Sequence, residues 1–223
     1  MHNRLKSPGT VENPWQTKPT DRFVLKWIKT HLSARITPRL TRLRWLRPWM
    51  LTFLSSIMGV SGGVIFALGW GFLAGWIAAC AQVLDGVDGQ FARLTGQQSK
   101  AGAFWDSVLD RYADGAMVIG TTVYLVRLPF ALPLWLLLMM GGLALIGSNL
   151  VSYSSARAES LGLDLGKPSF ASKGTRLAVM VLCGWGSPLW PGMPILALLY
   201  LAVHPNITVI QRLRRTLFTG ERR

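Results

Sequence analysis

Two long stretches of the chain carry almost no charge. Between Pro48 and Leu84 there is no Asp, Glu, Lys, Arg or His, and between Leu177 and Gln211 the only residue of these types is His204. A helix needs roughly 20 apolar residues to cross a lipid bilayer, and both stretches are longer than that. The pattern therefore predicts an all-α, polytopic membrane protein.

Glycine and proline divide the apolar stretches into separate helices. The sequence Gly69-Trp70-Gly71 separates the first two, and residues 186–192, with two prolines and two glycines, cannot continue a helix. With the other apolar segments, these breaks predict six transmembrane helices, at residues 49–69, 71–90, 102–126, 130–154, 174–189 and 193–212.

The N-terminal region has a different pattern. Residues 1–20 are polar and contain three prolines, which predicts a flexible cytosolic tail. From 21 to 36, apolar residues recur at helical spacing opposite Arg and Lys, which is typical of an amphipathic helix in the membrane interface. A helix packed on another domain gives the same pattern. The predicted organisation is a tail (1–20), a juxtamembrane amphipathic helix with a basic segment (21–47), a six-helix transmembrane domain (48–212) and a basic cytosolic tail (213–223).

The basic residues indicate how the chain is oriented. The sequence has 24 Lys and Arg against 10 Asp and Glu, a net charge of +14. A nucleic-acid-binding protein spreads such charge along solvated faces, so no nucleic-acid partner is expected here.

Lys and Arg mark cytoplasmic loops, and the outer connections of the predicted topology hold only Arg127. We expect a multi-pass protein of the cell membrane with both termini in the cytoplasm.

Acidic residues lie where a membrane protein rarely has them. A charge at the bilayer centre costs about 2.5–3.5 kcal/mol on insertion scales, so such residues are usually functional. Spacings of three and four residues put each of two Asp pairs on one helix face. Because the connection between the two helices is short, we expect antiparallel neighbours whose four carboxylates converge at the cytoplasmic edge. Five of the ten acids lie within or at the ends of predicted spans: Asp85, Asp88, Asp106, Asp110 and Asp114.

Four converging carboxylates require cations, because like charges in a low dielectric repel one another. Hard divalent ions such as Mg²⁺, Mn²⁺ or Ca²⁺ prefer oxygen ligands of this kind. Two such ions balance four carboxylates and leave positions for phosphate oxygens, as in two-metal phosphoryl transfer. The sequence therefore predicts a site for two ions, Mg²⁺ or Mn²⁺.

The acids belong to a longer pattern. It reads Asp85-x-x-Asp88-Gly89-x-x-Ala92-Arg93, and after eight residues Gly102-x-x-x-Asp106-x-x-x-Asp110. This resembles the signature of the CDP-alcohol phosphotransferase family, with every specified position present. The resemblance, which extends over most of the chain, implies transfer of a phosphatidyl group from a CDP-diacylglycerol-type lipid to a hydroxyl acceptor, with release of CMP. It also implies a homodimer.

The resemblance assigns roles to individual residues. It gives the metal ions to Asp85, Asp88, Asp106 and Asp110, and makes Asp110 the general base for the acceptor hydroxyl. Trp49 stands where the family often has Asn, so the cytidine contact there departs from the family pattern. The resemblance, together with the residues near the acids, gives five candidates for binding the CDP-lipid: Pro48, Thr52, Gly89, Arg93 and Ser99.

A second pattern concerns the acceptor. The stretch Ser152-Tyr153-x-x-Ala156-Arg157-Ala158-Glu159-x-x-Gly162 is similar to the family branch that makes phosphatidylinositol phosphate from inositol 1-phosphate, a phosphorylated polyol. Arg binds phosphate bidentately, although inner-leaflet charge alone also explains basic residues here. That branch tends to have Lys where this chain has Ser155. The candidate residues for binding the acceptor phosphate are Arg157, Lys173, Arg176 and Arg212.

Other interpretations stay open. The same reaction with another acceptor, such as glycerol 3-phosphate, fits the signature equally well. Intramembrane prenyltransferases also use Asp-rich motifs and Mg²⁺, but they need two such motifs on separate helical repeats. A cation- or proton-coupled membrane transporter explains acids in a membrane but not Arg93 or the short inner loop. A scaffold protein with a degraded site is disfavoured by the four intact Asp residues.

Overall fold

The computed structural model describes residues 26–129, 132–165 and 171–220, and the tail predicted at 1–20 lies outside these ranges. Over the described residues the secondary structure is helical and contains no strand, which confirms the all-α prediction. The elements in chain order are the π-helix η1 (Ile28–Ser33), α2 (Ala34–Leu40), α3 (Pro48–Ala67), α4 (Gly71–Leu94), α5 (Lys100–Val126), α6 (Leu134–Leu161), α7 (Lys173–Trp185) and α8 (Pro194–Gly220).

Three helices are long and apolar enough to cross a membrane: α3, α6 and, over Pro194–Leu217, α8. Helices α4 and α5 are of similar length, with 24 and 27 residues, but carry the acidic pattern. Helix α7 has only 13 residues, so at 1.5 Å per residue it spans about 20 Å. The length and the apolar composition of these three helices thus support the prediction of a helical membrane protein.

Several helices extend beyond the predicted bounds. Helix α4 continues to Leu94 rather than 90, and α8 continues to Gly220 rather than 212. Helix α6 begins at Leu134 and runs to Leu161, so Arg157 lies on a helix and not in a connection. No Pro or Gly interrupts residues 155–161, and α6 ends where Gly162 takes the left-handed conformation with φ of 66°.

Helix α3 organises one half of the bundle. It packs closely along both α4 and α5, whereas α4 and α5 have little or no contact with each other. The expectation that α4 and α5 are direct antiparallel neighbours is therefore wrong, and the reason lies in small residues on α3. A Cβ added at Gly59 would lie 2.7 Å from Ala113 Cβ of α5, and one added at Gly62 would lie 3.5 Å from Ala74 O of α4. Such residues let helix backbones approach closely.

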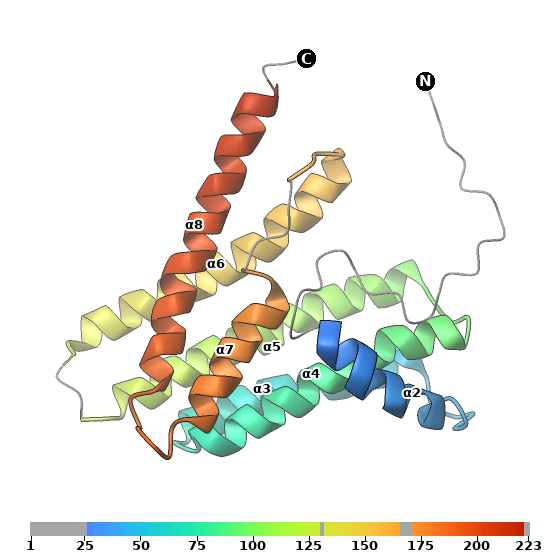
Figure 1. Cartoon of the computed structure of the whole chain (residues 1–223), viewed down its shortest axis with the longest axis horizontal. Helices are drawn as coiled ribbons and strands as arrows, with labels where there is room; N and C mark the ends of the chain where they lie inside the picture. The colour runs from blue at the N-terminus through green and yellow to red at the C-terminus, as the bar shows by residue number, and fades with distance from the viewer. Residues whose placement is uncertain (1–25, 130–131, 166–170, 221–223) are drawn as a thin grey trace.

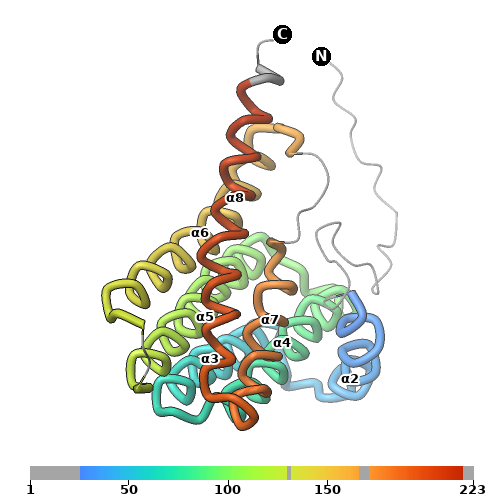
Figure 2. Tube along the Cα trace, turned by 60° about the vertical axis from the view of Figure 1, so that its left-hand side comes forward, coloured from blue at the N-terminus to red at the C-terminus, as the bar shows by residue number. Residues whose placement is uncertain are grey.

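The second half of the bundle consists of α6, α7 and α8 (Figures 1 and 2). Helices α6 and α8 cross and pack extensively, and α7 packs against α4 and so connects the two halves. Buried apolar side chains from both halves form one core, which includes Phe66, Met117, Leu125, Leu198 and Leu201. Large apolar residues also cover the outer surface, as expected where lipid replaces water.

The N-terminal helical segment packs against the C-terminal half of α4 (Figure 1). Ser33 Oγ donates a hydrogen bond of 2.8 Å to the Val83 carbonyl, and Thr37 Oγ1 donates one of 2.9 Å to Gln90 Oε1. Gln90 Nε2 in turn donates to the Lys29 carbonyl at 2.8 Å. These buried and partly buried hydrogen bonds hold η1 and α2 against the stretch of α4 that carries the first two acids of the pattern.

Candidate metal centre

Three carboxylates from two helices meet in one cluster. Asp85 comes from α4, and Asp106 and Asp110 come from successive turns of α5. One oxygen from each of them lies within 4.8 Å of the others, and all three residues are half-buried. The cluster forms although α4 and α5 barely touch, because both helices are positioned by α3.

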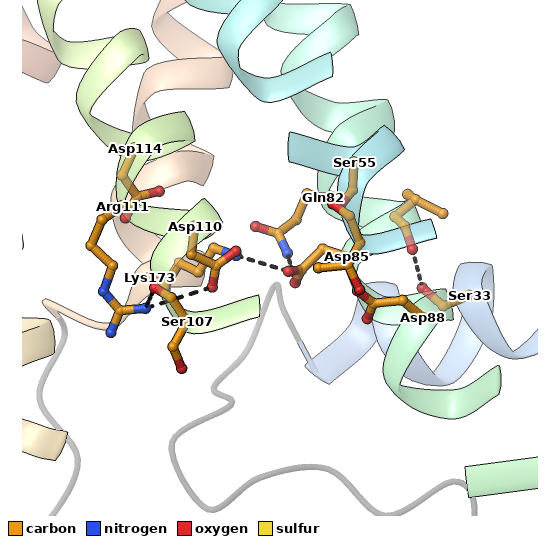
Figure 3. A network of polar contacts seen from close by, with 12 residues as sticks. Ser33, Ser55, Gln82, Asp85, Asp88, Ser107, Asp110, Arg111, Asp114 and Lys173 are labelled. Carbon is orange, nitrogen blue, oxygen red and sulfur yellow. Dashed lines mark hydrogen bonds and ion pairs between the residues drawn. The ribbon is translucent and has the colours of Figure 1, made fainter. Parts of the chain in front are cut away.

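A lysine from a third helix joins this cluster. Lys173, the first residue of α7, donates from Nζ to Asp85 Oδ1 at 2.9 Å and to Asp110 Oδ1 at 2.7 Å. Figure 3 shows its side chain between the two carboxylates. Gln82, one turn before Asp85, donates from Nε2 to Asp85 Oδ2 at 2.9 Å. Asp85 is thus held from two directions, by its own helix and by α7.

Asp88, the fourth predicted metal ligand, does not belong to this cluster. Its side chain is buried, with 6% of the residue exposed, and its Oδ2 accepts a hydrogen bond of 2.6 Å from Thr52 Oγ1 of α3. The structure therefore brings together three of the four predicted metal ligands. The fourth, Asp88, is instead hydrogen-bonded to Thr52, a residue predicted to contact the CDP-lipid.

The cluster fits a divalent cation in chemistry and spacing. All of its candidate ligands are carboxylate oxygens, which hard ions prefer. Opposite oxygens around Mg²⁺ lie about 4.2 Å apart, twice the usual Mg–O distance, so oxygens within 4.8 Å need only a small adjustment. Asp85, Asp106 and Asp110 therefore meet the requirements for holding such an ion.

The other residues predicted at the CDP-lipid lie at helix ends. Pro48 is the first residue of α3, and Arg93 is half-buried in the last turn of α4. A Cβ added at Gly89 would be in ordinary van der Waals contact with the Arg93 guanidinium, 3.6 Å away, so this guanidinium lies directly beside the glycine. Ser99 caps α5, because its Oγ accepts a hydrogen bond of 2.9 Å from the Gly102 amide.

Two of the predicted acceptor residues meet the same stretch of α6. Arg176 donates to Ser152 Oγ at 3.4 Å, and Arg212 donates to Ser154 Oγ at 2.6 Å and to Ser155 Oγ at 3.0 Å. Ser155, which stands where the related branch has Lys, thus serves as a partner of Arg212. Arg157 is exposed two residues further along α6, while Lys173 lies apart from this group, against the acidic cluster.

One acidic partner in this region was not among the predicted site residues. Asp114 accepts a hydrogen bond from Arg176 at 2.9 Å, and Arg176 is only 3% exposed. The signal for Asp114 was its position, four residues after Asp110 and so on the same helix face. A small cavity beside the cluster is lined by residues of α3, α4, α5 and α7, among them Ser55, Gly59, Gln82, Asp110, Asp114 and Lys173.

Carboxylates from two helices of a helical membrane protein thus gather at a position that fits a divalent cation. The chain belongs to the CDP-alcohol phosphatidyltransferase family, whose sequence profile matches residues 45–205. That match covers the acidic pattern and reaches from the start of α3 into α8.

Several characterised relatives are similar over most of the chain. A phosphatidylinositol phosphate synthase of Cutibacterium acnes is 34% identical over 192 residues, which cover 82% of this chain and 86% of that protein. An archaetidylinositol phosphate synthase of Pyrococcus horikoshii is 33% identical over 185 residues, covering 82% and 85%.

Solved structures give the same family relationship. The phosphatidylinositol phosphate synthase of Mycobacterium tuberculosis with CDP-DAG bound is 29% identical and superposes with a TM-score of 0.71, covering 82% of this chain and 92% of that one. A structure of the same enzyme with manganese and citrate has the same TM-score and identity, covering 82% and 88%.

Proposed function

We propose that this protein transfers a phosphatidyl group from a CDP-diacylglycerol-type lipid to inositol 1-phosphate and releases CMP. The observation that carries the proposal is the convergence of Asp85, Asp106 and Asp110 from the two helices of the family signature. The relatives named as phosphatidylinositol and archaetidylinositol phosphate synthases support the choice of acceptor.

In this proposal Asp110 takes the proton of the acceptor hydroxyl. Its carboxylate is held at Oδ1 by Lys173, 2.7 Å away, while Arg111 Nη1 lies 4.0 Å from its other oxygen, Oδ2. A general base must be within hydrogen-bond reach of the proton that it removes, and the hydrogen bond from Lys173 goes to Oδ1 rather than Oδ2. The deprotonated hydroxyl then attacks the phosphorus on the lipid side of the diphosphate, and the bond to CMP breaks.

Divalent cations would complete the site. We propose two ions, Mg²⁺ or Mn²⁺, held by Asp85, Asp88, Asp106 and Asp110; bound there, they would stabilise negative charge on the transferred phosphate and on CMP. The manganese-bound relative supports the chemistry of these ligands.

The CDP-lipid would enter from the helix ends around the cluster. We propose that Pro48 and Thr52 of α3, Gly89 and Arg93 of α4, and Ser99 before α5 line the nucleotide and its diphosphate. The position of the Arg93 guanidinium beside Gly89 supports this, because a guanidinium forms strong charge-assisted hydrogen bonds with phosphate oxygens.

The acceptor phosphate would bind where α6, α7 and α8 meet. Arg176 and Arg212 both contact residues 152–155 of α6, and Arg157 follows on the same helix. Guanidinium groups bind phosphate bidentately, and a phosphorylated polyol presents such a group. We propose these three arginines as the phosphate contacts. Lys173 would stand between this region and the acids.

We also propose how the protein sits in the membrane. Helices α3 to α8 would form six spans, with α4 and α5 included although they carry the acids and α7 although it is short. Lys and Arg placement supports cytoplasmic termini and a cytoplasmic active site. The segment with η1 and α2, with exposed Trp27 and Arg35, would lie in the interface. A homodimer is proposed from family likeness, and cross-linking in native membranes tests it.

The experiment measures CMP release in detergent micelles from CDP-diacylglycerol and Mg²⁺, with a panel of acceptors. Inositol 1-phosphate, glycerol 3-phosphate, free inositol and serine are supplied in turn. Asp110→Asn removes the base and should abolish turnover while retaining substantial metal binding, because Asp85 and Asp106 remain. Asp164→Asn, an exposed Asp outside the cluster, is the matched control and should stay active. CMP release with glycerol 3-phosphate alone would reject the acceptor, and full activity of Asp110→Asn would reject the base.

A further inference from the structure

Lys173 lies at the metal centre and not in the group of arginines with which its sequence position associates it. Its Nζ contacts Asp85 Oδ1 at 2.9 Å and Asp110 Oδ1 at 2.7 Å, and 24% of its side chain is exposed. Arg176, three residues later, instead pairs with Asp114 and Ser152. The two basic residues in the first turn of α7 therefore have different partners: Lys173 contacts Asp85 and Asp110, and Arg176 contacts Asp114.

The lysine and a divalent cation would bind the same two carboxylate groups, those of Asp85 and Asp110. Asp85 and Asp110 are two of the three residues whose carboxylate oxygens gather within 4.8 Å. An ammonium group is a compact point charge with three donors, and the short distances show it bound between two of those carboxylates. An oxygen that accepts from Nζ at 2.7 Å has its charge shared with the lysine, so a metal ion binding there meets a competitor.

Lys173 also joins three helices. Its backbone begins α7, while its two partners belong to α4 and α5, which have little or no contact with each other. Without a cation between them, the carboxylates of these helices repel one another. The ammonium therefore supplies attraction across the gap between α4 and α5 at the acidic end.

We propose that Lys173 is a displaceable internal cation of the metal centre. In the metal-free protein it holds Asp85 and Asp110 close together, and a divalent ion binds by replacing it on those oxygens. The proposal rests on the proposed function for the identity of the centre. It assigns Lys173 a positioning role toward the metal, in place of the acceptor contact expected from sequence.

Two measurements follow from this competition, both made on the full-length protein in detergent micelles. The first is Mn²⁺ affinity, measured by electron paramagnetic resonance without substrate. Lys173→Met removes the competitor and should tighten Mn²⁺ binding about tenfold or more, because two charge-assisted contacts are lost. Lys173→Arg keeps the charge and should tighten it by less than about twofold. Lys100→Met, at the exposed first residue of α5, is the matched control and should leave the affinity unchanged.

The second measurement is thermal stability with EDTA and with saturating Mn²⁺. Lys173→Met should lower the unfolding temperature in EDTA, because the carboxylates then repel without an internal cation. With Mn²⁺ the variant should match the wild type, since the ion takes over that role. An equal loss of stability under both conditions, or unchanged Mn²⁺ affinity, would overturn the proposal.

The outcomes separate this inference from the proposed function. If the wild-type protein releases CMP from CDP-diacylglycerol while Lys173→Met binds Mn²⁺ as the wild type does, the function stands and the displaceable cation is rejected. If Lys173→Met binds Mn²⁺ more tightly while the wild type releases no CMP with any acceptor, the inference stands and the function is rejected.

Discussion

The contact between α3 and α5 can be tested with a single methyl group. Gly59 of α3 faces Ala113 of α5, and a Cβ added at Gly59 would lie 2.7 Å from the Ala113 Cβ. Ordinary van der Waals contacts begin at 3.4 Å, so Gly59→Ala would force the helices apart by the difference, about 0.7 Å. Neither methyl can rotate away. Overpacking of this kind costs about 1–3 kcal/mol in the free energy of unfolding.

The same displacement should reduce activity. Gly59 and Ala113 line the cavity beside the metal centre, and Asp110 lies one turn before Ala113. Moving α5 away from α3 also moves Asp110 away from Asp85, because α4 is packed on α3 as well. A misplacement of about 1 Å can cost roughly a hundredfold in rate, so we expect a loss of about tenfold or more in CMP release.

The assay is thermal unfolding in detergent together with CMP release. Gly142→Ala is the matched control, because a Cβ at Gly142 meets no atom within 4 Å and should be neutral or slightly stabilising. The exchange variant Gly59→Ala with Ala113→Gly removes the clash and should be more stable than the two single changes predict together. The packing argument is refuted if Gly59→Ala proves as stable and active as Gly142→Ala.

Three further predictions concern the polar contacts of the site. Thr52→Val removes the hydrogen bond to Asp88 and leaves a buried carboxylate without that donor, which should cost about 1.5–3 kcal/mol in thermal or denaturant unfolding; an unchanged stability would contradict it. Arg212→Ala should raise the acceptor KM about tenfold with the CDP-lipid KM unchanged, while the exposed Arg215→Ala should alter neither; equal changes in both KM values would speak against an acceptor role. EDTA should abolish CMP release and Mn²⁺ should restore it, and turnover that persists in EDTA would exclude a metal-dependent reaction.

Patterns along the chain were sufficient to predict much of the fold. A helix has a fixed length per residue and a fixed period, so uncharged runs, Gly and Pro breaks and the spacing of the acids translate directly into helices and shared faces. The C-terminal ends of α6 and α8 were predicted less well. Residues 155–161 and 213–220 continue helices because nothing in them breaks a helix, whereas their charge had suggested connections.

Patterns along the chain did not predict which helices contact one another. The spacing of the carboxylates predicts which helix face they share, but not which other helix that face contacts. The packing of α4 and α5 on α3 depends on glycines of α3 that fit closely against these two helices. The pairing of Asp88 with Thr52 and the position of Lys173 at Asp85 and Asp110 join residues 36, 88 and 63 positions apart.

The sequence by itself determined that this is a helical membrane protein with a cluster of acids at the ends of two helices, because those features depend on neighbouring residues alone. Only the tertiary structure decided which three acids meet and which basic residue joins them. The physical reason is that side-chain partners are set by the distances between packed helices, and those distances follow from the size of residues at contacts far apart in the chain.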